Sequence, residues 1–160
     1  MIQSFSAFLG LATATLACLA AMALGGPTER FAGALLLVVN FSVLVIQSHS
    51  DWAGPQYMML AIDIVVLAIA IRLVLKTDRA WTVGLAAYYA LTVLTHLAML
   101  LEPAGERPEV HTWVYITGII VWGYLIWACL AWGTYTAWRE RTRLERNQDA
   151  SSGRNAPRRV

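Results

Sequence analysis

Long apolar runs separated by short polar stretches fill most of this 160-residue sequence. Each run is long enough, or nearly so, to cross a hydrocarbon core about 30 Å thick at about 1.5 Å per helical residue. The pattern therefore predicts an all-α integral membrane protein, a bundle of five transmembrane helices. The predicted spans cover residues 5–25, 31–48, 57–76, 81–101 and 113–135.

Composition agrees with this prediction and sets the domain limits. Hydrophobic residues make up 58% of the chain, charged residues only 14%, and the mean hydropathy is +0.56, outside the range typical of soluble domains. We expect one helical domain over residues 1–146, whose last part is stabilised by Arg141 and Glu145 at i,i+4 spacing. Residues 147–160 are rich in Ser, Asn, Pro and Arg, a composition that predicts a disordered basic tail.

The distribution of basic residues predicts the orientation. If all five runs cross, eleven of the 12 Lys and Arg residues lie at one set of ends and Arg107 alone lies at the other. The positive-inside rule then places the N-terminus outside and the C-terminus in the cytoplasm. The Ala-, Leu-, Arg- and Trp-rich composition indicates a bacterial cytoplasmic (inner) membrane. No nucleic-acid role is implied, because the basic tail suits anionic lipid headgroups.

The first run has features of a retained helix. No Lys or Arg precedes it, so the basic n-region of a signal peptide is missing. Small residues recur every four positions and would let another helix approach closely, inside this chain or in a partner. This predicted helix-packing face consists of Ser6, Gly10, Ala14 and Cys18.

Two ionisable side chains inside the apolar runs form the candidate site. A charged residue such as Asp63 costs about 2.5–3.5 kcal/mol at membrane depth, so it needs a partner. Asp63 lies about 12 Å, and His96 about 9 Å, from the predicted outer ends of their spans, at 1.5 Å per residue. Because a tight turn joins these antiparallel spans, we expect Asp63 and His96 to face each other in the outer half of the membrane.

Further polar side chains are expected to surround this pair. One side of the fourth run is polar and aromatic, whereas the opposite side, which includes Leu85 and Leu94, is apolar. A polar helix face inside a membrane is expected to look toward protein. The predicted intramembrane polar network therefore adds Asn40, Gln47, Tyr88, Tyr89 and Thr92 to the pair.

Three interpretations of this network compete. It could fix helix packing through hydrogen bonds, or it could relay protons, because a carboxylate beside an imidazole exchanges them near neutral pH. A metal or haem site would need His96 with His49 or His111, but no two histidines stand at i,i+3 or i,i+4 spacing. We favour the packing role and predict neither a metal nor another cofactor.

The sequence lacks the motifs of soluble-type catalysis. There is no GxSxG, no HExxH and no Gly-rich phosphate loop. We expect a non-enzymatic accessory or assembly subunit of a membrane complex, embedded in the bilayer with a membrane-protein partner or as a homo-oligomer. The alternatives are a proton- or ion-coupled transport or channel component that uses Asp63 and His96, and a holin-like membrane-permeabilising protein.

Overall fold

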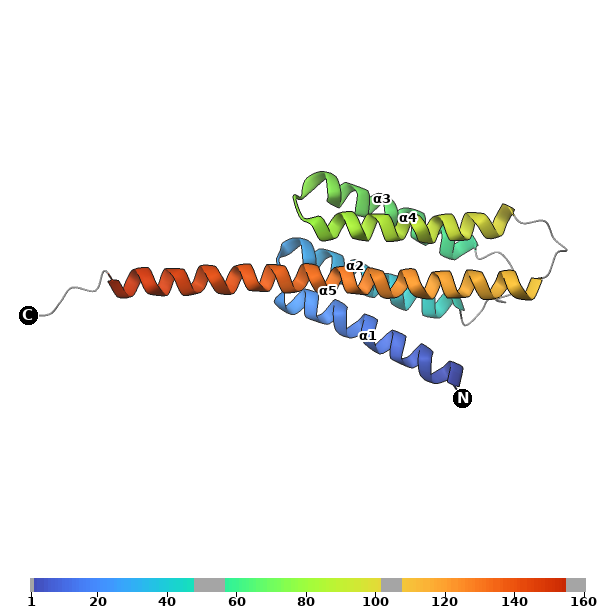
Figure 1. The fold of residues 1–160 in the computed structure, drawn as a ribbon, viewed down its shortest axis with the longest axis horizontal. Coiled ribbons are helices and arrows are strands. Elements are labelled where there is room, and N and C mark those ends of the chain that lie inside the picture. Colours follow the sequence, from blue (N-terminus) through green and yellow to red (C-terminus); the bar gives the residue numbers. More distant parts are fainter. Residues whose placement is uncertain (1, 48–56, 102–107, 155–160) are drawn as a thin grey trace, which may run out of the picture.

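The computed structural model describes residues 2–47, 57–101 and 108–154, and these residues are helical apart from two short turns. Five helices follow the order of the apolar runs, and successive helices run antiparallel (Figure 1). The predicted all-helical architecture is confirmed. The helices are α1 (Ile2–Leu24), α2 (Pro27–Gln47), α3 (Tyr57–Lys76), α4 (Ala80–Leu101) and α5 (Pro108–Arg154).

Local chemistry explains the helix boundaries. α1 ends just before Gly25 and Gly26, and α2 begins at Pro27, which suits a first helical position because its missing N–H would have no partner there. Glu29 lies in the first turn of α2, where a carboxylate interacts favourably with the helix dipole. α5 likewise begins at a proline, Pro108, five residues before the predicted span.

Four helices are long and apolar enough to cross a membrane: α2, α3, α4 and the part of α5 that begins at Trp113. In α1 the described side chains run from Phe8 to Leu24, and this stretch is apolar but shorter than the other four. Large apolar side chains lie exposed on all five helices. This surface is what a lipid-facing bundle requires, since lipid tails are as apolar as the side chains that meet them.

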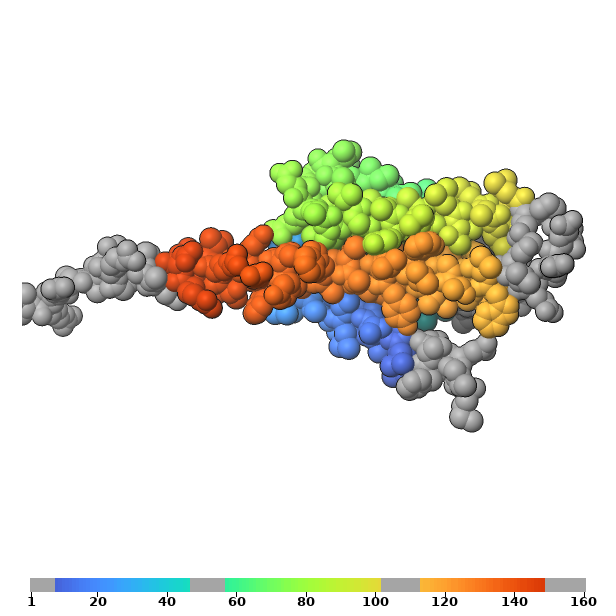
Figure 2. All heavy atoms as spheres, viewed as in Figure 1, coloured from blue at the N-terminus to red at the C-terminus, as the bar shows by residue number. Residues whose placement is uncertain are grey.

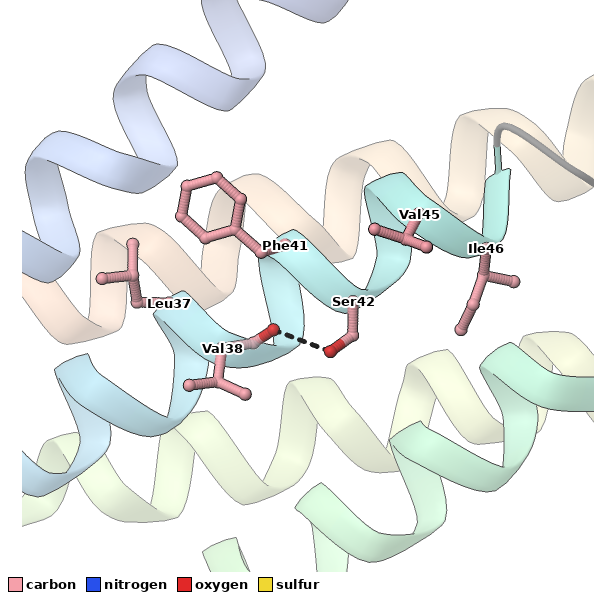
Figure 3. Close-up of a pocket in the computed structure, with 6 residues that line it drawn as sticks. All are labelled: Leu37, Val38, Phe41, Ser42, Val45 and Ile46. Carbon is pink, nitrogen blue, oxygen red and sulfur yellow. Dashed lines mark hydrogen bonds between the residues drawn. The ribbon is translucent and has the colours of Figure 1, made fainter.

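One feature of this apolar surface is a shallow groove along α2, which Figure 3 shows in close-up. Its polar side chain is Ser42, whose hydroxyl donates to the carbonyl of Val38 at 2.9 Å. The helix itself therefore satisfies this hydroxyl, and the groove offers no free donor to a ligand. The residues that line it are Leu37, Val38, Phe41, Ser42, Val45 and Ile46.

α5 occupies the centre of the helix contacts. It packs against α1, α2 and α4, while α3 packs mainly on α4. α4 is therefore covered on two sides, and Leu85 from its predicted apolar side is only 2% exposed, whereas Leu94 is 59% exposed. The buried core consists of Cys18, Ala21, Ala32, Leu36, Val66, Ala70, Trp81, Leu85, Tyr89, Ile126 and Leu130.

The small-residue face of α1 is used inside the chain. Ala14 and Cys18 are buried, and α1 packs closely against α2 and α5. On α2, a Cβ placed at Gly33 would lie 2.9 Å from the carbonyl oxygen of Cys18, so the close approach depends on glycine at that position. Gly10 faces α5, where the hydroxyl of Tyr124 would lie 3.7 Å from an added Cβ. The side chain of Ser6 lies outside the described residues.

α5 continues well past the other helices (Figure 1). It remains helical to Arg154, so residues 147–154 do not form the disordered tail that composition predicted. Extending a formed helix adds one hydrogen bond for each residue that is fixed, and the free-energy cost of nucleating the helix has already been met within the bundle. Residues 155–160 lie outside the described part of the chain.

Candidate functional site

His96 lies at the centre of a buried polar chain that joins three helices. Its Nε2 atom is 3.1 Å from Oδ2 of Asp63 on α3, and its Nδ1 atom is 2.9 Å from the hydroxyl of Tyr115 on α5. The side chain of Asp63 is 13% exposed, and His96 and Tyr115 are 4% and 6% exposed. The rings of His96 and Tyr115 meet edge to face, with centroids 5.4 Å apart.

The depth of each residue along its helix explains this meeting. His96 lies five residues before the end of α4, and Tyr115 lies seven residues after the start of α5. Two antiparallel helices place such residues at similar distances, about 8–10 Å, from their shared connection. Asp63 is six residues into α3 and reaches the same level from the other side of α4. The structure thus brings Asp63 and His96 together in the predicted way.

The geometry fits a neutral imidazole with its proton on Nε2. That N–H donates to the carboxylate of Asp63, and the hydroxyl of Tyr115 donates to Nδ1, so each group meets a complementary partner. A protonated imidazole would also be satisfied, because Nδ1–H could donate to the oxygen of Tyr115. The arrangement can therefore hold a proton on His96 or release it without breaking either contact.

The other predicted members on α4 do not extend this chain. Tyr89 and Thr92 are buried and Tyr88 is half-buried, so the polar side of α4 does face protein. However, Thr92 donates its hydroxyl to the carbonyl of Tyr88 at 3.0 Å and is satisfied within its own helix. Among the described residues, no hydrogen bond joins the hydroxyls of the two tyrosines to Asp63 or His96.

The two predicted amides of α2 have a different outcome. Asn40 is half-buried, and its Nδ2 atom is fully buried with no partner among the described side chains. Asn40 therefore donates no hydrogen bond to Asp63 or His96 among the described side chains. The side chain of Gln47 lies outside the described residues.

The histidines proposed for a metal or haem site cannot be placed against His96. His49 and the side chain of His111 lie outside the described residues. Within the part of the chain that the structure describes, no three His, Cys, Asp or Glu side chains form a group able to hold a metal ion. Cys18 and Cys129 are both free thiols.

A further polar contact joins α4 to α5 near the same end. The indole Nε1 of Trp122 donates to the hydroxyl oxygen of Thr95 at 3.2 Å, and Thr95 donates in turn to the carbonyl of Leu91 at 2.8 Å. A Cβ added at Gly118 would make ordinary van der Waals contact with the side chain of the same threonine. Together with the His96–Tyr115 bond, this contact fixes the register of α4 against α5.

A second buried charged cluster lies at the opposite end of the bundle. Glu29 is fully buried (0% exposed), and its Oε1 atom accepts from Nε1 of Trp81 at 3.0 Å. The same oxygen is 3.3 Å from a guanidinium nitrogen of Arg79, whose other terminal nitrogen is 3.5 Å from Glu140 on α5. Arg79 thus connects the start of α2 with the point where α5 leaves the bundle.

Sequence reasoning missed both Glu29 and the role of Trp81. Trp81 is buried against Gly133, where an added Cβ would lie 2.6 Å from the indole. The available signal was an acidic residue just before an apolar run, a few positions after two glycines. Tyr115 was also missed, although its depth after the last connection matches that of His96 before it.

No protein-family model, curated protein or solved structure matches this chain, so a function must be argued from these two buried clusters and from the projecting end of α5.

Proposed function

We propose that this protein is a non-enzymatic accessory subunit of a membrane complex, whose bundle anchors a rigid helical arm outside the membrane. The arm is the part of α5 from Arg139 to Arg154. The observation that carries the proposal is that α5 continues as one helix to Arg154 (Figure 1) and that its end projects past the rest of the bundle (Figure 2).

The exposure of the arm supports a partner-binding role. From Arg139 to Gln148 every side chain except Thr142 is exposed, so no other described part of the chain covers this segment. A helix that is polar all round gains little from packing against its own domain, and such helices commonly bridge to another domain. The arm carries charges of both signs along its length.

The base of the arm is held by the bundle, which suits an anchor. Glu140 contacts Arg79 at 3.5 Å, and the guanidinium of Arg141 donates to the carbonyl of Gly25 at 3.1 Å. These contacts come from both turns at this end, α1–α2 and α3–α4. They fix the direction in which the arm leaves the bundle.

We further propose that the arm lies on the cytoplasmic side of a bacterial inner membrane, with the N-terminus outside. Both described turns and the arm lie at one end of the bundle (Figure 1), and all nine Lys and Arg residues of the described ranges lie at or beyond that end. The positive-inside rule supports the cytoplasm for that end. Attaching a fluorescent or phosphatase reporter after residue 160 tests this orientation directly.

The subunit role is tested by native mass spectrometry of protein extracted from its own membranes in mild detergent. Full-length protein is expected to retain the mass of another chain, and a variant ending at Thr142 is expected to lose it while keeping Glu140 and Arg141. A variant with Arg143→Gln and Arg146→Gln keeps the full arm and shows whether its charge is recognised. Masses that are only multiples of 17.7 kDa for the full-length protein would refute the proposal.

The buried chain from Asp63 through His96 to Tyr115 favours a second candidate, a proton-coupled transport component. Its three titratable groups contact one another in sequence, and His96 keeps both contacts in either protonation state. This role predicts that Asp63→Asn retains the fold but abolishes a pH-driven flux in proteoliposomes. Equal flux in the variant and the parent protein would exclude it.

A further inference from the structure

We propose that Arg30 and Arg141 form a binding site for a phosphate group at the α1–α2 turn. Both guanidiniums meet at one atom, the carbonyl oxygen of Gly25. Nε of Arg30 donates to it at 3.1 Å, and a terminal nitrogen of Arg141 donates to it at 3.1 Å. This site goes beyond the subunit role, because it recognises a small anionic group rather than a protein partner.

The two arginines come from distant parts of the chain and carry like charges. Arg141 is 116 positions from Gly25 in the sequence, and Arg30 is 5 positions from it. Because one nitrogen of each guanidinium donates to the same oxygen of Gly25, the two nitrogens can be separated by at most the sum of these two hydrogen-bond distances. Two guanidiniums at that separation repel each other unless an anion lies between them.

Neighbouring carboxylates form no ion pair with these two arginines. Each arginine directly follows a glutamate, and one oxygen of Glu29 and one of Glu140 contact Arg79. The other oxygen of Glu29, Oε2, is buried at the same turn without a hydrogen-bond partner among the described residues, and a Cβ added at Gly26 would lie 2.8 Å from it. Three arginines against two glutamates leave one net positive charge, so the turn still attracts an anion.

Their free donors match the chemistry of a phosphate. Arg30 uses Nε on Gly25 and keeps its two terminal nitrogens, while Arg141 uses one terminal nitrogen and keeps the rest of its guanidinium. Bonds of about 2.8 Å from each guanidinium to different oxygens would let one phosphate bridge the pair. Both side chains belong to exposed residues, so the ligand could reach them without opening the bundle.

The site also lies where lipid phosphates are found. It stands at the ends of α1 and α2, where apolar helices give way to polar turns, at the basic end of the bundle. A phosphate could come from an anionic phospholipid headgroup or from a free phosphate anion. Both sources use the same donors, and the experiment separates them.

The test is native mass spectrometry of the full-length protein released from nanodiscs of phosphatidylcholine with or without phosphatidylglycerol, and with or without inorganic phosphate. The parent protein is expected to retain phosphatidylglycerol selectively. The variants Arg30→Gln and Arg141→Gln should each weaken retention about tenfold, the loss expected for a hydrogen bond to a charged group. The matched control is Arg143→Gln, an exposed arginine of the arm without a contact at the turn, which should change retention little.

The outcomes decide both the site and its source. Selective retention of phosphatidylglycerol that inorganic phosphate does not displace assigns a lipid headgroup, and displacement by inorganic phosphate assigns a free anion. Equal losses in the two variants and the Arg143→Gln control would overturn the site. If the variants do not fold, hydrogen–deuterium exchange on the parent protein decides: phosphatidylglycerol or inorganic phosphate must slow exchange around Gly25, and no change would overturn the proposal.

Discussion

Replacing Tyr115 with phenylalanine isolates one bond of the buried chain. The change removes the hydroxyl that lies 2.9 Å from Nδ1 of His96 but keeps the ring, whose edge-to-face contact with the imidazole has a centroid distance of 5.4 Å. Apolar burial and ring packing therefore stay nearly constant. The loss of stability then reports the hydrogen bond and the cost of leaving Nδ1 without a donor.

The expected magnitude follows from the burial of both partners. Hydrogen bonds between membrane helices average about 0.6 kcal/mol and reach about 1.7 kcal/mol in double-mutant cycles. His96 is 4% exposed, so water cannot readily replace the lost donor, and an unsatisfied buried group costs about 1–3 kcal/mol. We expect Tyr115→Phe to lower the free energy of unfolding by about 1–1.7 kcal/mol, the range in which these two estimates overlap.

The assay is reversible unfolding by a denaturing detergent in mixed micelles, followed by the fluorescence of the seven tryptophans. The control is Tyr124→Phe on the same helix, since this tyrosine is 47% exposed and its hydroxyl forms no hydrogen bond among the described residues. Combining Tyr115→Phe with Asp63→Asn should give a non-additive loss, because both changes act on one imidazole. A loss equal to that of the control would refute the hydrogen-bonded chain.

Three further predictions use the same unfolding assay. Gly133→Ala places a Cβ 2.6 Å from the indole of Trp81 and should lower the free energy of unfolding by about 1–3 kcal/mol. The control Gly123→Ala, with open space around it, should be neutral or stabilising. Equal effects of the two variants would contradict the close contact. Glu29→Gln keeps an acceptor for the indole of Trp81 but loses the ion pair with Arg79, and should lower the free energy of unfolding by about 1.5–3 kcal/mol. An unchanged unfolding midpoint would show that this ion pair contributes nothing. Ala14→Leu overpacks a 1%-exposed position and should cost about 1–3 kcal/mol in the monomer; a loss of oligomeric mass alone would contradict this packing.

Much of the candidate site could be predicted from the sequence, because the position of a residue along a helix can be counted from the end of its apolar run. Asp63 and His96 stand at similar distances from the same end of two antiparallel helices, and the structure places them 3.1 Å apart. The partner on the other side of His96 was not predicted. Choosing Tyr115 required knowledge that α5 packs on α4, and the order of helices along the chain does not fix their neighbours.

The second buried cluster shows the same limit more clearly. Glu29 lies in the first turn of helix α2, and Arg79 lies in the connection between α3 and α4. In the sequence, each is simply a charged residue beside an apolar run. Only packing makes Glu29 fully buried and turns it toward Trp81 and Arg79. Counting basic residues by loop predicts an orientation, but it cannot show which of them lack a carboxylate partner.

The sequence by itself determined the number and order of the helices, the extent of their apolar parts and which of their residues are polar, because apolar run length, glycine and proline act locally. The tertiary structure alone decided that α5 is central, that the small-residue face of α1 packs inside the chain, and that Arg30 and Arg141 converge on Gly25. The reason is physical. Helix formation depends on near neighbours in the sequence, whereas helix pairing depends on how whole surfaces fit, and side chains 116 positions apart meet only after that fit exists.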